Sequence, residues 1–423
     1  MASSDIYKIL SLDGGGTWAL LQVLTLKDIF EKKYPGKNIQ GHEVLRHFDM
    51  VVANSGGSMV LAALACNWSF DEITALFDDE ATRYTIFKKL PFKDLYFPNA
   101  IFRLFGFKTF GARYSTTAKR KGLSDILRIN GTKKLDSVPL TELPSLMGKE
   151  SLELIVATFD IVNKRARLFR SNKKSMAMAE NVAGFDHFDH VSLVEAIHGS
   201  SNAPVNYFDF PAVFSPEGTR KRFYLWDGAL GGFNNPILAG ITEAVANGVK
   251  RENIKVLSIG TASKIVSQEK INTFHKQYYN TLIGSKWLNG KFPYRFFKGK
   301  KFFISIISNL SKTILFEPHY WSTYAAYMFL LSDTNNKDFN IIRLSPQIVL
   351  NSKSDDLIKR LYNLDMDVTE QKDMDAIKIC FERWKNGKIQ NEPIQWDINI
   401  NRKYIFALGH KTYAEAMNDL NWI

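Results

Sequence analysis

The sequence is poor in cysteine and contains no apolar run long enough to be a membrane span. Cys66 and Cys380 are its two cysteines, too few for a disulfide framework and without the spacing of metal ligands. The N-terminus has no basic segment followed by an apolar core, so we expect no signal peptide. The longest apolar stretch, residues 302–316, falls short of the roughly 18 residues that a span requires and contains Lys312. We therefore expect a soluble chain in a reducing compartment such as the cytoplasm.

Acidic residues are scarce in two segments, which carry the basic excess of a chain with net charge +12. Residues 86–134 contain 12 Lys/Arg against two acidic residues, and residues 264–312 contain 10 against one. Both segments interleave aromatic with basic side chains. This pattern is typical of surfaces that bind single-stranded nucleic acid and of membrane interfaces, but an ordinary helical subdomain with solvated lysines shows it too. Composition alone leaves these three interpretations open.

Strand-like and helix-like patterns alternate over the first 260 residues of the 423-residue chain. Short apolar runs bounded by turn residues predict buried strands at residues 6–12, 50–53, 152–159, 223–226 and 254–260. Helical spacing is present at residues 20–33, 59–65, 69–84, 191–197 and 234–247. This alternation indicates an α/β fold, a three-layer sandwich in which helices cover both faces of a mainly parallel central sheet.

Three consecutive glycines, Gly14, Gly15 and Gly16, separate the first predicted strand from the first predicted helix. At a helix N-terminus the backbone N–H groups are unpaired, and glycine permits dihedrals that aim several of them at one point. Such a loop can form an oxyanion hole for acyl transfer or can bind a phosphate. The D-G-G-G-T sequence also resembles the phosphate-binding turn of sugar kinases with the actin-like ATPase fold. In that fold the turn joins two strands, whereas helical spacing follows it in this chain, so we favour an oxyanion hole over a phosphate loop or a plain turn.

A second strand-to-helix junction carries a serine at its tightest point, in the sequence Ala53-Asn54-Ser55-Gly56-Gly57. This order fits a nucleophile elbow, usually written G-x-S-x-G, which presents a serine hydroxyl at the top of a sheet. The residues two before and two after the serine must be small because strand and helix nearly touch there. Ala53 and Gly57 meet that demand. A plain strand-to-helix turn shows the same short pattern, so Ser55 needs support from elsewhere in the chain.

A carboxylate that can serve such a serine follows the strand at residues 223–226. Asp227 would lie at the same edge of a parallel sheet as Ser55, because the carboxyl ends of parallel strands meet there. His198 is the alternative partner, as the third member of a Ser-His-Asp triad. The D-H-F-D-H run at residues 186–190 has no further ligands at metal-site spacing, so it predicts a solvated loop and no metal site.

Together, three blocks resemble the patatin-like phospholipase family, of the type found in bacteria. The D-G-G-G block that begins at Asp13 is similar to the glycine-rich oxyanion loop of the family, the N-S-G-G block around Ser55 to its nucleophile elbow, and the D-G-A block at Asp227, with N-N-P after it, to its D-G-[GA] block. Supporting matches are S-S-N-A-P at residues 200–204 and L-S-I-G-T at residues 257–261. The three main blocks occur in the order of the family.

The resemblance extends over about residues 5–262. It implies a patatin-like catalytic core at residues 1–262, with a basic insertion at about 86–134. Residues 263–340 would then form a basic, aromatic-rich lid or docking insertion. Residues 341–423 show no resemblance of their own and would complete the domain.

By this resemblance Ser55 is the nucleophile and Asp227 its general base, a dyad without histidine, and the N–H groups of Gly14, Gly15 and Gly16 hold the oxyanion. The resemblance implies a serine esterase that cleaves phospholipid carboxyl esters and needs neither a cofactor nor a metal. A serine hydroxyl is a poor nucleophile until a base takes its proton, and a carboxylate is a strong enough base only in a dry site. The residue types therefore fit the implied chemistry.

Two departures from the family pattern leave a second hypothesis open. The family loop usually reads D-G-G-G-x-R-G, whereas this chain has Trp18 in place of the arginine and Ala19 in place of the final glycine. Ala53 replaces the first glycine of the elbow. The alternative is a catalytically inactive protein that keeps the fold and binds a membrane or a ligand.

If the substrate is a lipid, a membrane interface is the favoured interpretation of the two basic segments, over nucleic-acid binding and over an ordinary helical subdomain. We expect Trp287, Lys298, Lys300 and Lys301 to contact a membrane surface or an anion, so that a cytoplasmic protein associates peripherally with membranes. Nucleic acid is the disfavoured partner. Some bacterial relatives of the family are immune effectors that a cyclic nucleotide activates, so a nucleotide activator is a minor alternative by analogy alone. A homo-oligomer remains open.

Overall fold

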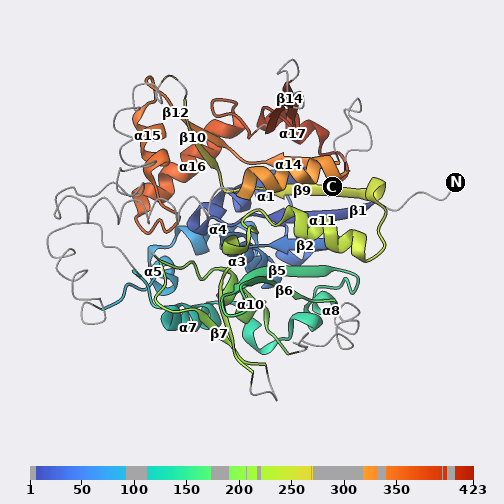
Figure 1. Ribbon diagram of the computed structural model, residues 1–423, viewed down its shortest axis with the longest axis vertical. Helices are drawn as coiled ribbons and strands as arrows, with labels where there is room; N and C mark the ends of the chain where they lie inside the picture. The colour runs from blue at the N-terminus through green and yellow to red at the C-terminus, as the bar shows by residue number, and fades with distance from the viewer. Residues whose placement is uncertain are drawn as a thin grey trace, which may run out of the picture.

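The computed structural model describes residues 6–91, 112–172, 190–205, 207–216, 221–267, 269, 318–330, 340–392, 394–397 and 405–423. These residues form a three-layer α/β fold in which a mainly parallel sheet lies between two layers of helices (Figure 1). The fold class predicted from the alternation of strand and helix patterns is confirmed.

The secondary structure follows the predicted order through β9. The strands are β1 (Tyr7–Leu12), β2 (Met50–Ala53), β3 (Arg128–Ile129), β4 (Lys133–Lys134), β5 (Glu153–Asp160), β6 (Arg165–Arg170), β7 (Ala212–Phe214), β8 (Phe223–Asp227), β9 (Ile254–Ile259), β10 (Ser263–Val266), β11 (Ile341–Leu344), β12 (Gln347–Leu350), β13 (Ile394–Asp397) and β14 (Ile405–Leu408). The α-helices are α1 (Leu20–Lys33), α2 (Gly41–Arg46), α3 (Ser55–Ala65), α4 (Phe70–Asp78), α5 (Glu80–Ile86), α7 (Thr116–Ile126), α8 (Leu143–Leu146), α10 (Leu193–Ser200), α11 (Ile237–Ala246), α14 (Pro318–Leu330), α15 (Asp356–Asn363), α16 (Gln371–Lys385) and α17 (Tyr413–Asp419). Short 3₁₀ turns are η1 (Gly16–Ala19), η3 (Leu135–Ser137), η4 (Leu140–Glu142), η5 (Gly228–Gly231) and η6 (Arg251–Asn253).

The central sheet has a parallel part and an antiparallel part. Its strand order is β11-β9-β1-β2-β5-β8-β7, and β6 also pairs with β5. The pairs from β11 to β5 are parallel, whereas β6, β8 and β7 join by antiparallel pairing. The loops that follow β1 and β2 therefore leave the sheet at the same edge, and these are the glycine-rich loop and the serine elbow.

Each face of the parallel part packs against its own layer of helices. Successive side chains of a strand point to opposite faces, so Ile9 and Val52 pack in one core with α11 and α14, while Leu10 and Val51 pack in the other with α1, α3 and α10. In Figure 1, α11 and α14 lie on the near side of β1, β2 and β9. Burial on both faces explains why these strands read as continuous apolar runs in the sequence.

The helix predicted at residues 69–84 is interrupted. Ser69 begins α4 with a capping box, in which its side chain accepts from the Glu72 N–H and the Glu72 carboxylate accepts from the Ser69 N–H. Asp79 then adopts an extended conformation, and its carboxylate accepts from the Thr82 N–H to begin α5. The prediction of one continuous helix was wrong because an aspartate competes for the backbone N–H groups of the following turn.

The C-terminal segment is built into the core of the fold. β11 extends the central sheet beside β9, and β12 pairs with β10. α16 packs against α1, and Figure 1 shows α15 and α16, in orange and red, beside the elements that carry the glycine-rich loop. In the part of the chain that the structure describes, no helix combines the length and the apolar character needed to cross a membrane.

Candidate active site

Ser55 lies at a strained turn between β2 and α3. Its φ angle is 47°, in the left-handed region that non-glycine residues rarely adopt, and its side chain is almost completely buried. The turn is tight because a Cβ atom added to Gly57 would lie 2.4 Å from the Leu12 carbonyl oxygen. Ala53 ends β2 in the ordinary extended region, so its methyl group strains nothing. Strain of this kind is found where a nucleophile is held in place.

The pairing of β5 brings Asp227 to the level of Ser55. Ala53 pairs with Val156 of β5, and Asp227 pairs with Thr158, two residues further along the same strand. Because β6 occupies the other edge of β5, β8 lies on the β2 side and approaches the elbow from the opposite direction. The expectation that the strand before Asp227 is parallel was therefore wrong, since β8 is antiparallel to β5 and still ends next to the elbow.

The Asp227 carboxylate is fully enclosed and makes several hydrogen bonds. It accepts from Asn54 Nδ2 at 3.0 Å and from the Ala229 N–H at 2.9 Å, and it lies close enough to the Ser55 side chain for the two to interact. Burial raises the pKa of Asp227 above its ordinary value, while the interaction with Ser55, the hydrogen bonds from Ala229 and Asn54 and the charge of Lys119 act in the opposite direction. The higher pKa makes Asp227 a better proton acceptor than an exposed aspartate.

The elbow backbone is fixed by a serine that lies outside the predicted site. The Ser55 N–H donates to Ser200 Oγ at 2.8 Å, and Ser200 Oγ in turn donates to Asn54 Oδ1 at 3.2 Å. Asn54 thus connects the α10 end, the elbow and Asp227. In the sequence, Ser200 belongs to a block that matches the family, but the pattern indicates no role for Ser200 or for the Asn54 side chain.

The N–H groups of the three glycines after β1 are not all available as oxyanion donors. The Gly14 N–H donates to the Asn234 carbonyl at 2.7 Å, so the prediction of Gly14 as an oxyanion donor is corrected. For the N–H groups of Gly15 and Gly16, the described residues provide no hydrogen-bond acceptor, and the same holds for Gly56 in the first turn of α3. These three donors flank the serine and are free to bind an oxyanion.

Glycine is required at the two free loop positions. Gly15 has φ 153° and a Cβ atom there would lie 2.1 Å from Thr261 Oγ1, while a Cβ atom on Gly16, at φ 60°, would lie 2.2 Å from the Met366 carbonyl oxygen. Thr261 Oγ1 also donates to the Gly14 carbonyl at 2.5 Å. The loop is therefore closely surrounded by β9 and by the C-terminal segment.

Residues 365–368 support the glycine-rich loop from outside. The Thr17 N–H and hydroxyl both donate to the Met366 carbonyl, at 2.9 Å each, and the Val368 N–H donates back to Thr17 Oγ1 at 3.0 Å. Trp18, which replaces the arginine of the family pattern, is buried and donates from Nε1 to the Asp365 carbonyl at 3.0 Å. Trp18 thus has a structural role in anchoring this loop.

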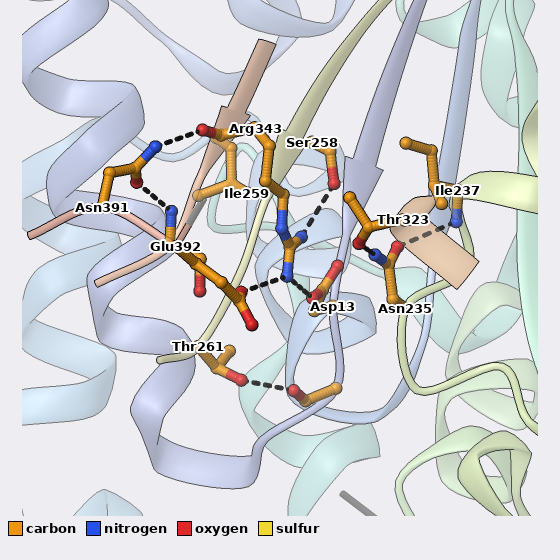
Figure 2. Close-up of polar contacts among 12 residues, drawn as sticks. Asp13, Asn235, Ile237, Ser258, Ile259, Thr261, Thr323, Arg343, Asn391 and Glu392 are labelled. Atoms are coloured by element: carbon orange, nitrogen blue, oxygen red, sulfur yellow. Dashed lines mark hydrogen bonds and ion pairs between the residues drawn. The ribbon is translucent and has the colours of Figure 1, made fainter. Parts of the chain in front are cut away.

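A buried arginine holds the other end of the same loop. Arg343 on β11 donates to Asp13 Oδ2 at 2.6 Å and to Ser258 Oγ at 2.8 Å, and it lies 3.5 Å from Glu392 (Figure 2). Asn391 caps the same strand, because its side chain accepts from the Ser345 N–H and donates to the Arg343 carbonyl. Residues beyond position 340 therefore determine where Asp13 and the following glycines lie.

A largely apolar pocket opens next to Ser55. Its apolar wall includes Met59, Leu76, Phe77, Ile86, Phe87 and Phe208. Gly16, Ser55 and Gly56 line it as well, so the serine and two of the residues with free N–H groups border the same cavity. Such a pocket accommodates an acyl chain or another apolar group beside the serine. Two basic residues of its lining, Arg83 and Lys119, were not identified from the sequence.

Several predicted features do not join the site. The His198 ring makes no hydrogen bond to Ser55 or Asp227, and burial lowers its pKa well below the ordinary value, so it does not act as the third member of a triad in this geometry. The predicted anion or membrane contacts Trp287, Lys298, Lys300 and Lys301 lie outside the described residues. The same is true of most of the D-H-F-D-H run.

Comparison with known proteins places these features in a family. A model of the family described as patatin-like phospholipase matches residues 10–241, more than half of the chain. Patatin-like protein 4 of Arabidopsis thaliana is 25% identical over 303 residues, which are 67% of this chain and 64% of the plant protein. The chain thus spans less than two thirds of the length of that relative.

Two solved structures resemble the chain weakly. VipD from Legionella pneumophila aligns over 89% of this chain and 67% of its own, with 10% identity and a TM-score of 0.35. ExoU from the type III secretion system of Pseudomonas aeruginosa, solved in complex with SpcU, aligns over 46% of this chain and 38% of that chain, with 14% identity and a TM-score of 0.22. Because both scores lie below 0.5, neither likeness indicates more about this chain.

Proposed function

This chain belongs to the patatin-like phospholipase family, and from that premise we propose that it is a lipid acyl hydrolase that cleaves carboxyl esters of phospholipids. Ser55 is the proposed nucleophile and Asp227 the proposed general base. The observation that carries the proposal is the closeness of Ser55, at its strained turn, to the enclosed Asp227 carboxylate, together with the N–H groups of Gly15 and Gly16 that have no acceptor among the described residues. The apolar pocket beside Ser55 supports a substrate with an acyl chain.

The proposed reaction has two steps. Ser55 Oγ attacks the ester carbonyl carbon while its proton passes to Asp227, and the carbonyl oxygen, now negative, accepts hydrogen bonds from the Gly15 and Gly16 N–H groups. The bond to the glycerol oxygen then breaks, and the leaving alcohol takes the proton from Asp227. A water molecule then attacks the carbonyl carbon of the acyl-serine and gives a proton to Asp227. The bond between Ser55 Oγ and the acyl group breaks, the fatty acid leaves, and Ser55 Oγ takes the proton back from Asp227.

Preorganised donors are expected to supply a large part of the rate. Loss of one oxyanion donor typically raises the barrier by about 3–4 kcal/mol. Gly15 and Gly16 are fixed by Thr261 and Met366, so they need no rearrangement when the negative charge develops. The positive end of the α3 helix dipole points at the same place.

A serine-reactive probe tests the proposal. We expect a fluorophosphonate to label the wild-type protein at Ser55 and to leave Ser55→Ala unlabelled, because the probe needs an activated serine. Vesicles of phosphatidylethanolamine and phosphatidylglycerol should release fatty acid with the wild-type protein and not with Ser55→Ala, as lipid profiling would measure. Ser137→Ala is the matched control, since Ser137 is exposed at η3 and donates to the Lys134 carbonyl. A wild-type protein that is neither labelled nor hydrolytic would instead support a non-catalytic member of the fold.

The pH dependence of hydrolysis should report the environment of Asp227. Asp227 must be ionised to accept the Ser55 proton, and burial raises its pKa above the ordinary value of 3.8. As the pH falls through this raised pKa, Asp227 takes up a proton, so kcat/KM should decline at a pH clearly above 3.8. The measurement is kcat/KM for a soluble short-chain phosphatidylcholine between pH 3 and pH 9, with a check of the protein's stability at each pH. An acid limb centred at or below pH 3.8 would contradict the assignment of Asp227 as the base.

A further inference from the structure

Arg83 is a buried cation in the wall of the pocket, and its hydrogen-bond partners are all uncharged. It lies on α5 with 2% of its surface exposed. Its Nη1 donates to the Phe77 carbonyl at 2.8 Å, its Nε and Nη2 to the Thr369 carbonyl at 3.2 and 3.0 Å, and its Nη2 also to Gln371 Oε1 at 3.1 Å. These contacts use four of the five N–H groups of the guanidinium. None of the described carboxylates lies within ion-pair distance of it, although Asp78 and Asp79 interact with it electrostatically.

Lys119 is a second buried cation in the same pocket. It lies on α7 with 1% of its surface exposed, and its Nζ donates to the His198 carbonyl at 3.0 Å and to Ser201 Oγ at 3.3 Å. The ammonium also lies 4.2 Å from the centre of the Phe208 ring. The nearest acidic influence is Asp227, which affects Lys119 electrostatically, although none of the described carboxylates is within ion-pair distance of it. One of its three N–H groups is left for a ligand.

Two buried cations without carboxylate partners are costly unless an anion joins them. Transfer of a charge into an apolar environment is strongly unfavourable, and buried charges are normally paired. The lining of the pocket supplies no such partner beside either cation within the described residues. Burial lowers the pKa of Lys119 well below its ordinary value, and a bound anion would favour the charged form again. An anion that enters the pocket would supply the negative charge that the lining of the pocket lacks.

We propose that Arg83 and Lys119 form an anion subsite in the pocket, and that it binds the phosphate diester of a lipid whose ester carbonyl lies at Ser55. The proposal rests on the proposed function and deepens it, because it assigns a charged phospholipid, and not a neutral acylglycerol, as the preferred substrate class. Guanidinium and ammonium groups bind phosphate oxygens through charge-assisted hydrogen bonds. The apolar wall around the two cations receives the acyl chain, so one cavity recognises both parts of the lipid.

Equilibrium binding to a Ser55→Ala protein tests the subsite without any turnover. Isothermal titration would compare dihexanoylphosphatidylglycerol, dihexanoylglycerol, sodium hexanoate and inorganic phosphate, with the lipids below their critical micelle concentrations. We expect dihexanoylphosphatidylglycerol to bind about tenfold to hundredfold more tightly than dihexanoylglycerol, as charge-assisted hydrogen bonds allow. Lys119→Met in this background should remove at least about tenfold of that preference. Lys121→Met is the matched control, since Lys121 is on the same helix with 80% of its side chain exposed, and it should keep the preference.

Three outcomes would overturn the proposal. Equal binding of the phospholipid and the diacylglycerol by the Ser55→Ala protein would do so whether or not the Lys119→Met variant folds. Hexanoate that binds as tightly as the phospholipid would identify a carboxylate site, and inorganic phosphate that binds as tightly would identify a site for a free ion. Because the titration needs no activity, its failure is distinct from the failure of the proposed function, which the labelling of Ser55 decides separately.

Discussion

An Asp227→Asn protein should hydrolyse phospholipid esters about 10²–10⁴ times more slowly than the wild-type protein, because a carboxamide cannot take the proton of Ser55. The substitution keeps the shape of the side chain, and its oxygen can still accept from Asn54 Nδ2 and from the Ala229 N–H. The fold should therefore persist. The measurement is the steady-state kcat for fatty acid release from a soluble phosphatidylcholine, together with the thermal unfolding midpoint.

Asp160 offers a matched control for this substitution. It is a buried aspartate at the end of β5, and its carboxylate accepts from Asn163 and Arg167, away from the serine. Asp160→Asn should change kcat by less than about threefold, because Asp160 has a structural role and lies away from the reacting atoms. An Asp227→Asn protein that retains kcat within tenfold of wild type would show that some other group accepts the Ser55 proton.

Arg343→Met should lower the free energy of unfolding by about 3–5 kcal/mol, because it leaves Asp13 and Glu392 as buried carboxylates without their cation. Methionine fills a similar length of the cavity, so most of the loss should come from charge and not from packing. Since Asp13 begins the glycine-rich loop, the rate of hydrolysis should fall as well. Urea unfolding at constant pH measures the change in stability.

Arg170→Met is the control for the loss of an ion pair. Arg170 pairs with Glu243 in a partly exposed position, where such pairs typically contribute about 1 kcal/mol or less. A double variant, Arg343→Met with Asp13→Asn, should recover part of the loss, because one of the two stranded charges is removed. Similar small losses for Arg343→Met and Arg170→Met would mean that the network in Figure 2 does not stabilise the fold.

Short-range features of the site were predictable because they depend on neighbours in the sequence. The strained turn at Ser55 needs a small residue at position 57, and the glycine run needs positions that tolerate positive φ. Both demands leave a local signature of small residues between apolar runs. The alternation of strands and helices predicted that β1 and β2 are parallel. The loops that follow these two strands were therefore expected at the same edge of the sheet.

Features that depend on strand pairing were not predictable. The sequence of β8 resembles a buried parallel strand, and nothing in it indicates that it runs antiparallel to β5. The loss of Gly14 as an oxyanion donor likewise depends on the Asn234 carbonyl, 220 positions away in the chain. Sequence patterns indicate which residues come together at the site. The direction of a strand and the partner of a backbone N–H group depend on tertiary packing.

Buried charges from distant segments were the largest omission. The sequence analysis did not identify Arg343, Arg83 and Lys119 as buried charges, because no residue next to them in the chain indicates a partner for them. Their burial depends on partners that come from elsewhere, as with the contact of Arg83 with Thr369. A single sequence holds no local signal for such pairs.

The support of the glycine-rich loop by residues 365–368 has a consequence for the making of the protein. A growing chain that has already folded its elbow still lacks the carbonyl of Met366 and the guanidinium of Arg343, which keep the loop in shape. The glycine-rich loop therefore reaches the arrangement described above only after residue 366 has been synthesised.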